Sequence, residues 1–225
     1  MTGAGSLGHA WDVSPAEAIQ IQKRLAPRVS RENAFDPEKL TLVAGVDAGF
    51  PKETARAAIA VLTYPALEVV ETAVAEIPVT FPYVPGLLSF REAPAVLAAF
   101  EKLKAKPELL IVDGQGLAHR RRFGIACHLG VLLDVPAIGS AKSLLVGRHA
   151  PLPEEAGSVV DLVDRGEVVG AVVRTRTGVK PLYVSIGHGI DLPTAVEVIL
   201  STCRRYRLPE PQRAAHNSAS GYARA

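Results

Sequence analysis

The stretch "KLTLVAGVDAGF" (residues 39–50) decides the fold, because it is an apolar run of strand length that reaches an acid. Its residues Leu40 to Val46 predict a buried strand that ends on Asp47. The next two runs, "ARAAIAVLTY" (55–64) and "LEVVETAVAEIPV" (67–79), predict two more strands joined by a proline-containing turn. Three consecutive strands with short connections predict an antiparallel meander.

Helices and further strands are expected on both sides of this meander. Residues 14–28 begin with an N-cap serine and a proline and carry apolar residues at helical spacing, which predicts an amphipathic helix. After the meander, helical and strand patterns alternate. We expect helices over 87–104, 123–134 and 193–205, strands over 108–113, 135–141, 167–176 and 181–187, and a polar loop over 151–158.

This order predicts an α/β fold. An antiparallel trio of strands followed by parallel strand–helix units forms a mixed sheet with helices on both faces, as in a ribonuclease-H-like core. Actin-like nucleotide-binding domains begin with the same order, so the pattern is compatible with both. The 225 residues suit one well-buried domain over 1–225, and we expect irregular tails over about 1–12 and 208–225.

Composition narrows the class of protein. A net charge of +2 argues against binding of polyanions by bulk charge, although a local basic face stays possible. The two cysteines, Cys127 and Cys203, have no CxxC spacing, so a disulfide framework and a zinc site are not expected. The N-terminus lacks the pattern of a signal peptide, and no apolar run reaches the roughly 18 residues of a membrane span. We therefore expect a cytoplasmic protein.

Two acids follow buried strand runs. Asp47 follows "VAGV" and Asp113 follows "LLIV". In open α/β sheets, ligand sites lie beyond the strand ends, so neighbouring strands can bring these carboxylates together. Close carboxylates repel each other unless a cation holds them, and Mg²⁺ prefers carboxylate, water and phosphate oxygens. With a third acid they are the set expected for phosphodiester hydrolysis. The alternative is that each aspartate only begins a turn.

Glu92 is the candidate for the third acid. It also completes the S-x-x-E pattern of a capping box with Ser89, in which the glutamate would only cap a helix. Pro94 argues against that second interpretation, because with Ser89 as the N-cap the proline would fall inside the helix. The two roles can also coexist.

The run of residues 110–147 concentrates glycines and basic side chains. The glycines permit close approach of a backbone to a ligand, and Arg120 to Arg122 could contact phosphates or form a solvated surface. Lys142 follows a predicted strand near the expected meeting point of the acids, where it could face a phosphate or remain a surface lysine. His128 lies among apolar residues of a helix and is expected to be a core histidine.

The stretch "FPYVPGLLSFREAP" (81–94) contains Glu92 near its end. Prolines on both sides of Tyr83 and Val84 restrict the backbone, so the tyrosine ring is expected to point outward from a stiff loop.

Five motifs in this order resemble the endonuclease V family of DNA repair enzymes: "AGVD", "PYVPGLLSFRE", "VDGQGLAHRRRFGIACHLGVLLDVPAIGSAK", "KPLYVSIGH" and "RLPEPQR". The resemblance runs from about Ala44 to Arg213. It implies a ribonuclease-H-like fold and Mg²⁺-dependent hydrolysis, with Mn²⁺ as a substitute metal. The implied substrate is DNA with a deaminated base, chiefly deoxyinosine, cut at the second phosphodiester bond 3′ to the lesion to leave 3′-hydroxyl and 5′-phosphate ends.

The resemblance also implies roles for particular residues. Asp47 and Asp113 would hold the metal, with Glu92 acting on it through water. Lys142 and His119 would support the scissile phosphate, and His216 matches a tail position where the family often has a histidine. The implied lesion-binding and DNA-binding residues are the wedge Pro82, Tyr83, Val84 and Pro85, which inserts at the strand gap, and the pocket residues Gly86, Leu88, Gly114, Gly116, Gly124 and Ile125.

Partners follow from this resemblance. We expect a monomer that binds single-stranded or double-stranded inosine-containing DNA and no membrane. The closest alternative is an inosine-specific endoribonuclease on the same scaffold, which would bind inosine-containing RNA. An actin-like phosphotransferase needs a Gly/Thr-rich phosphate loop, for which "DAGFPKET" (47–54) is a poor match. A non-catalytic inosine reader would be expected to lose the acids, and all three are present.

Overall fold

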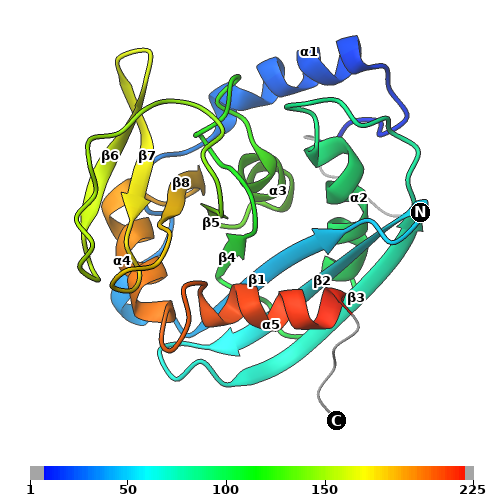
Figure 1. Ribbon diagram of the computed structural model, residues 1–225. Helices are drawn as coiled ribbons and strands as arrows, with labels where there is room; N and C mark the ends of the chain where they lie inside the picture. Colours follow the sequence, from blue (N-terminus) through cyan, green and yellow to red (C-terminus); the bar gives the residue numbers. More distant parts are fainter. Residues whose placement is uncertain (1–7, 221–225) are drawn as a thin grey trace.

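A computed structural model describes residues 8–220 of the chain. These residues contain one sheet of eight strands in the order β3-β2-β1-β4-β5-β8-β7-β6 (Figure 1). The strands are β1 (Leu42–Gly49), β2 (Thr54–Thr63), β3 (Val69–Pro78), β4 (Leu109–Val112), β5 (Ala137–Ala141), β6 (Val159–Asp164), β7 (Glu167–Val173) and β8 (Leu182–His188).

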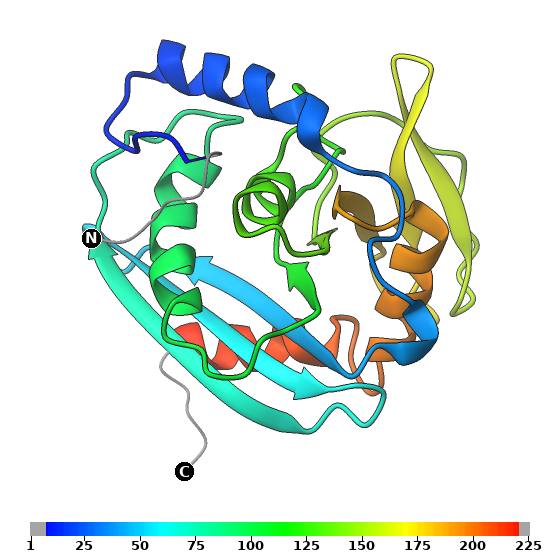
Figure 2. The ribbon, with the colours of Figure 1, turned by 180° about the vertical axis from the view of Figure 1, so that it is seen from behind.

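Helices cover both faces of the sheet, which confirms the predicted fold class. In the two opposite views, α2 and α3 lie on one face and α5 crosses the other face over β1 and β2 (Figures 1 and 2). The α-helices are α1 (Pro15–Leu25), α2 (Ser89–Phe100), α3 (Ile125–Leu133), α4 (Leu192–Thr202) and α5 (Glu210–Ala219), and short 3-10 helices span Ala26–Arg28 and Pro37–Lys39. The buried cores combine small and branched apolar residues of the strands with apolar residues of the helices and loops that cover them.

The strand pairing places the site. Strands β1, β2 and β3 form the predicted antiparallel meander. Strands β1, β4 and β5 run parallel to one another as neighbours, so their carboxyl ends lie at the same edge of the sheet. Strand β8 then pairs antiparallel with β5. The predicted order of helices and strands from α1 to α4 is thus present, with one strand added.

Two predictions about the strands are wrong. Strand β6 lies directly after the predicted polar loop, and it was not predicted because its sequence "VVDLVD" carries two acids and only one of its residues is buried. Strand β1 continues past Val46, so Asp47 lies inside the strand, opposite Ala58 of β2, rather than at its end. The first aspartate is therefore held by the pairing of β1 with β2, one residue beyond the last pair that β1 forms with β4.

The predicted irregular tail over 208–225 is also wrong for residues 208–220. They contain α5, whose N-cap is Pro209 and whose first turn contains Pro211. Prolines suit the first helical turn because the N–H groups there have no partner within the helix. Pro211, Gln212 and Ala215 are buried against the sheet. The remaining parts of the predicted tails, 1–7 and 221–225, lie outside the described residues.

Close contact between α5 and β1 depends on Gly45. A Cβ atom at Gly45 would lie 1.9 Å from the carbonyl oxygen of Pro211. That position faces the same side of β1 as Asp47, two residues further along the strand. The absence of a side chain at Gly45 therefore lets α5 lie directly on the strand that carries Asp47.

We expect Gly45→Ala to lower the free energy of unfolding by about 1–3 kcal/mol, because the added methyl group meets backbone atoms that cannot rotate away. Gly49→Ala, on the same strand, is the matched control, since nothing lies within 4 Å of a Cβ atom there. It should change stability by less than ~0.5 kcal/mol. Urea unfolding of the two variants measures the difference, and equal losses would contradict the packing role of Gly45.

Candidate active site

Three neighbouring strands bring an acid, a second acid and a lysine together. Asp47 lies on β1, and Asp113 follows β4, where its backbone N–H donates to the carbonyl of Val46 at 2.9 Å and extends the ladder between β4 and β1. Burial first, and the negative charge of Asp47 in addition, raise the pKa of Asp113, so the two carboxyl groups are close enough to interact electrostatically. Lys142, directly after β5, forms an ion pair with Asp113. The predicted convergence of these three side chains is therefore present.

Glu92 joins this group from helix α2. Its side chain is buried, with 8% of the residue exposed. Burial first, and the negative charges of Asp113 and Asp47 second, raise the pKa of Glu92 to about 8. Burial likewise raises the pKa of Asp113, while the Lys142 ammonium opposes that shift. The three carboxyl groups therefore form one electrostatically coupled cluster.

The capping-box hypothesis for Glu92 is wrong. Helix α2 starts at Ser89 with Leu88 as its N-cap, and no side chain caps it. The Ser89 hydroxyl instead contacts Nδ1 of His128 at 3.1 Å. His128 is fully buried, which confirms the predicted core histidine. The Glu92 carboxyl is thus free of any capping role.

Helix α5 supplies His216 to the same cluster. Its Nδ1 lies 2.9 Å from Oδ2 of Asp47. This histidine falls within the predicted irregular tail, and the helix that carries it was not predicted. The amphipathic spacing of the buried residues Pro211, Gln212 and Ala215 is the signal that could have located it.

The cluster suits a divalent cation in its chemistry. Its ligand atoms are carboxylate oxygens, which Mg²⁺ prefers, and their mutual repulsion would be relieved by a positive ion between them. Among residues 8–220, no three His, Cys, Asp or Glu side chains already stand in the arrangement of a metal site. The fit therefore rests on the type of donor and on the raised pKa values.

A cavity of about 340 Å³ lies beside the acids, and Glu92, Asp113 and Lys142 form part of its wall. That volume falls within the range of small-ligand pockets. Five of the predicted pocket residues also line it: Gly86, Leu88, Gly114, Gly124 and Ile125.

Gly116 does not line this cavity. A Cβ atom there would lie 2.0 Å from the carbonyl oxygen of Ile186, and its N–H donates to the hydroxyl of Ser185 at 2.9 Å. Gly116 therefore packs the loop after β4 against β8. Gly116 is buried, and its predicted DNA-binding or lesion-binding role stays a prediction.

The loop before α2 carries Tyr83 outward, as its prolines predicted. Tyr83 is 70% exposed, while Phe81 is buried and anchors the beginning of the loop. Pro82 and Pro85 are exposed and Val84 is partly buried. The tyrosine ring is thus available to a partner while both flanks of the loop are held.

Three side chains hold this loop at the carbonyl of Gly86, which has a left-handed backbone with φ of 81°. The carbonyl oxygen accepts hydrogen bonds from Nε2 of Gln22 at 3.1 Å, Nε2 of His119 at 3.1 Å and a terminal nitrogen of Arg121 at 2.6 Å. Arg121 also donates to Oε1 of Gln22. Neither Gln22 nor Arg121 was singled out in the sequence, because they meet only in the folded protein.

His119 lies in the cavity wall, and both of its ring nitrogens form hydrogen bonds with backbone groups of the protein. Its Nδ1 accepts from the backbone N–H of Arg121 at 3.2 Å, so its Nε2 carries the hydrogen donated to Gly86. Burial first, and the charge of Arg121 second, lower the pKa of His119 to about 4. His119 is therefore a neutral support of the loop. Its predicted contact with the scissile phosphate stays a prediction.

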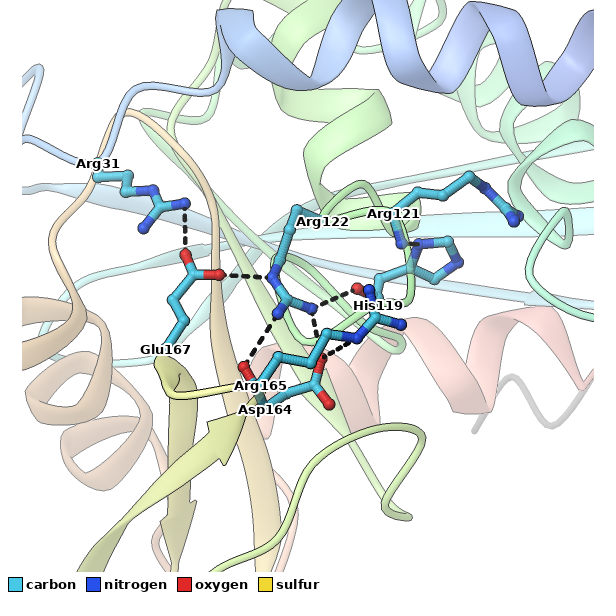
Figure 3. A network of polar contacts seen from close by, with 7 residues as sticks. All are labelled: Arg31, His119, Arg121, Arg122, Asp164, Arg165 and Glu167. Atoms are coloured by element: carbon cyan, nitrogen blue, oxygen red, sulfur yellow. Dashed lines mark hydrogen bonds and ion pairs between the residues drawn. The ribbon is translucent and has the colours of Figure 1, made fainter.

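The three consecutive arginines have different roles. Arg121 holds the Gly86 loop, and Arg122 pairs with Glu167 at 2.7 Å and with Asp164 at 2.8 Å (Figure 3). Arg120 is exposed. Phosphate contact by the whole triplet is thus replaced by structural roles for two of its members, and only Arg120 presents an open guanidinium.

A second hollow of about 720 Å³, called the groove below, is lined by Asp47, Asp113, Lys142 and His216. Lys142 is fixed between the two hollows, because Arg207 donates to its backbone carbonyl at 2.8 Å. Arg207 is a further residue that the sequence patterns did not indicate. Asp113 and Lys142 therefore border both the cavity and the groove.

The order of the mixed sheet, with one acid within β1 and another directly after the parallel strand β4, defines the class of ribonuclease-H-like nucleases. A model of the Endonuclease V family matches residues 23–217. Endonuclease V of Trichormus variabilis is 54% identical over 214 residues, which cover 94% of this chain and 96% of that protein. The chain belongs to the endonuclease V family.

Solved structures agree with this assignment. The crystal structure of Streptomyces avermitilis endonuclease V superimposes with a TM-score of 0.90 at 40% identity and covers 95% of this chain and 94% of its own. Ciona intestinalis endonuclease V, solved with a 24mer DNA containing an inosine followed by a ribo-adenosine, has a TM-score of 0.82 at 30% identity and covers 92% of this chain and 96% of its own. No helix in the described part of the chain is long and apolar enough to cross a membrane.

Proposed function

We propose that this endonuclease recognises deaminated bases in DNA, chiefly deoxyinosine, and hydrolyses the second phosphodiester bond 3′ to the lesion with Mg²⁺. The products would carry 3′-hydroxyl and 5′-phosphate ends. The observation that carries the proposal is that Asp113 and Lys142 line both the cavity and the groove. A base held in the cavity would place the following backbone across the acids.

The cavity and the exposed loop divide the work of recognition. A base edge is hidden inside a duplex, so an enzyme that reads it must turn the nucleotide out of the stack. Tyr83 is exposed and its loop is fixed at Gly86, a combination that suits insertion into the space left by the base. A mispaired inosine costs less to unstack than a paired normal base, which favours the lesion.

Asp47 and Asp113 would hold the Mg²⁺, and Glu92 would act on it through water. When bound, the ion supplies Lewis-acid charge for the phosphate oxygens and lowers the pKa of a water molecule that can attack the phosphorus. Lys142, fixed by Asp113 and Arg207, offers a positive charge for the phosphate. His216 holds the Asp47 carboxyl in place from α5.

Cleavage of inosine-containing RNA on the same site is the second candidate. The Ciona intestinalis relative was solved with a strand in which a ribo-adenosine follows the inosine. The groove beside the acids would have to accept the 2′-hydroxyl of the nucleotide that follows the lesion, since this group distinguishes RNA from DNA.

One experiment separates these candidates. Labelled inosine DNA, uracil DNA, intact DNA and inosine RNA are incubated with the enzyme and Mg²⁺, and the cut is mapped on a sequencing gel. We expect one cut in inosine DNA, at the second bond 3′ to the inosine, and little cleavage of intact DNA. Preferential cutting of inosine RNA would favour the second candidate, and cutting of all substrates alike would contradict lesion recognition.

A further inference from the structure

A chain of three polar side chains leads from the N-terminal segment into the wall of the cavity. His9 Nε2 lies 2.7 Å from His128 Nε2, and His128 Nδ1 lies 3.1 Å from the hydroxyl oxygen of Ser89. Ser89 lines the cavity beside Glu92. The proposed mechanism gives no task to either histidine, although His128 is fully buried in the core.

The contact of His9 with the backbone of Ala10 sets the direction of the hydrogen bonds between His9, His128 and Ser89. His9 Nδ1 lies 2.7 Å from the carbonyl oxygen of Ala10, which can only accept, so Nδ1 carries a hydrogen. In a neutral ring, His9 Nε2 then accepts, and His128 Nε2 donates to it. His128 Nδ1 is left as an acceptor, so the Ser89 hydroxyl donates its hydrogen to His128.

The surroundings keep both rings neutral and keep water away from the inner contact. Burial lowers the pKa of His9 and lowers the pKa of His128 to about 3. The rings of Trp11, Phe90 and Phe123 lie with centroids 5.2 Å from that of His128. Because the contact between His128 and Ser89 is buried and the His9 ring is oriented by Ala10, the order of donors and acceptors in the three side chains is fixed at neutral pH.

As a consequence, the Ser89 hydroxyl can only accept a hydrogen bond from a ligand in the cavity. Since the hydrogen of Ser89 is given to His128, its oxygen offers only lone pairs to a ligand. Two other polar side chains of the wall are already engaged. Gln22 donates to the carbonyls of Gly86 and Phe123 and accepts from Arg121, and both ring nitrogens of His119 are bonded to backbone groups.

We propose that Ser89 is a specificity-determining residue, which accepts a hydrogen bond from the ring N–H that deamination creates, and that His128 and His9 are its positioning residues. The inference rests on the proposed function. Deamination of adenine to hypoxanthine changes N1 from an acceptor to an N–H donor. An acceptor-only oxygen matches hypoxanthine and faces the adenine N1 lone pair without a hydrogen between them, so the cavity would reject adenine.

The test measures binding of single-stranded oligonucleotides that differ in one base: deoxyinosine, or deoxynebularine, whose purine ring keeps N1 as an acceptor. Fluorescence anisotropy without a divalent metal gives the ratio of the two dissociation constants. We expect wild type to prefer deoxyinosine, and Ser89→Ala to reduce that preference about tenfold through loss of one hydrogen bond. His128→Phe should reduce it as well, because the freed Ser89 hydroxyl can then donate to the nebularine N1.

Thr202→Val is the matched control. The Thr202 hydroxyl is also buried, but it bonds only to carbonyls of α4, at 2.7 Å to Val198 and 3.1 Å to Ile199. It should leave the ratio unchanged. Because both oligonucleotides are measured on one preparation, partial unfolding of a variant does not alter the ratio. A ratio within twofold of wild type in either Ser89→Ala or His128→Phe overturns the inference, whereas wild type that fails to cut deoxyinosine with Mg²⁺ overturns the proposed function itself.

Discussion

Asp47→Ala and Asp113→Ala are each expected to lower Mg²⁺-dependent nicking of inosine DNA by about 10³-fold or more, the scale on which loss of a main electrostatic group in an active site is felt. Both carboxyl groups lie in the cluster that includes the buried Glu92. Binding of the lesion should persist, because the cavity wall that includes Gly86, Gly124 and Ile125 is untouched. Single-turnover cleavage and a separate binding assay measure the two effects.

A readout without activity tests the metal in the same variants. A ligand that binds only the folded state at about 100 times its dissociation constant adds ~2.7 kcal/mol of stability. Mg²⁺ or Mn²⁺ should therefore raise the Tm of wild type and raise it less in Asp47→Ala and Asp113→Ala. Asp161→Ala, which removes an exposed carboxylate from β6, is the matched control and should behave as wild type. Wild-type cleavage rates in both active-site variants would refute the assignment.

The meeting of Asp47 and Asp113 could be predicted from the sequence. Apolar runs before Asp47 and Asp113 predicted neighbouring buried strands, and parallel pairing of β1 with β4 brings the two acids together. Burial periodicity and the order of the strands are local signals, so they can be read from the sequence without knowledge of the tertiary structure. Glu92 was ambiguous because the S-x-x-E pattern is equally local. Only the packing of α2 over the sheet decides that its carboxyl faces the aspartates.

Contacts between distant segments were beyond the sequence patterns. Helix α5 is polar and begins among prolines, so its stability comes from packing on β1 at Gly45 rather than from intrinsic helix propensity. The position of His216 beside Asp47 depends on that packing. In the same way, the bonds from Gln22 and Arg121 to Gly86 join three separate parts of the chain. No residue spacing in the sequence predicts contacts between segments so far apart.

Tyr83→Ala is expected to reduce discrimination between inosine duplex and intact duplex by about tenfold, while cleavage of an inosine-containing single strand changes little. A base–aromatic stacking contact is worth ~1–3 kcal/mol, and a wedge acts only where a stack must be opened. Tyr83 is 70% exposed, so its removal should alter stability by less than ~0.5 kcal/mol. The ratio of kcat/KM on the two duplexes, measured beside the single strand, gives the effect.

Two matched variants make the result specific to the wedge. Tyr83→Phe keeps the ring and should retain discrimination, since stacking needs the aromatic face rather than the hydroxyl. Tyr206→Ala removes another exposed aromatic residue, 48% exposed in the connection between α4 and α5, and should have no effect. If Tyr83→Ala lost activity equally on duplex and single strand, the tyrosine would contribute to general DNA binding, and separation of the strands would have to come from another part of the loop.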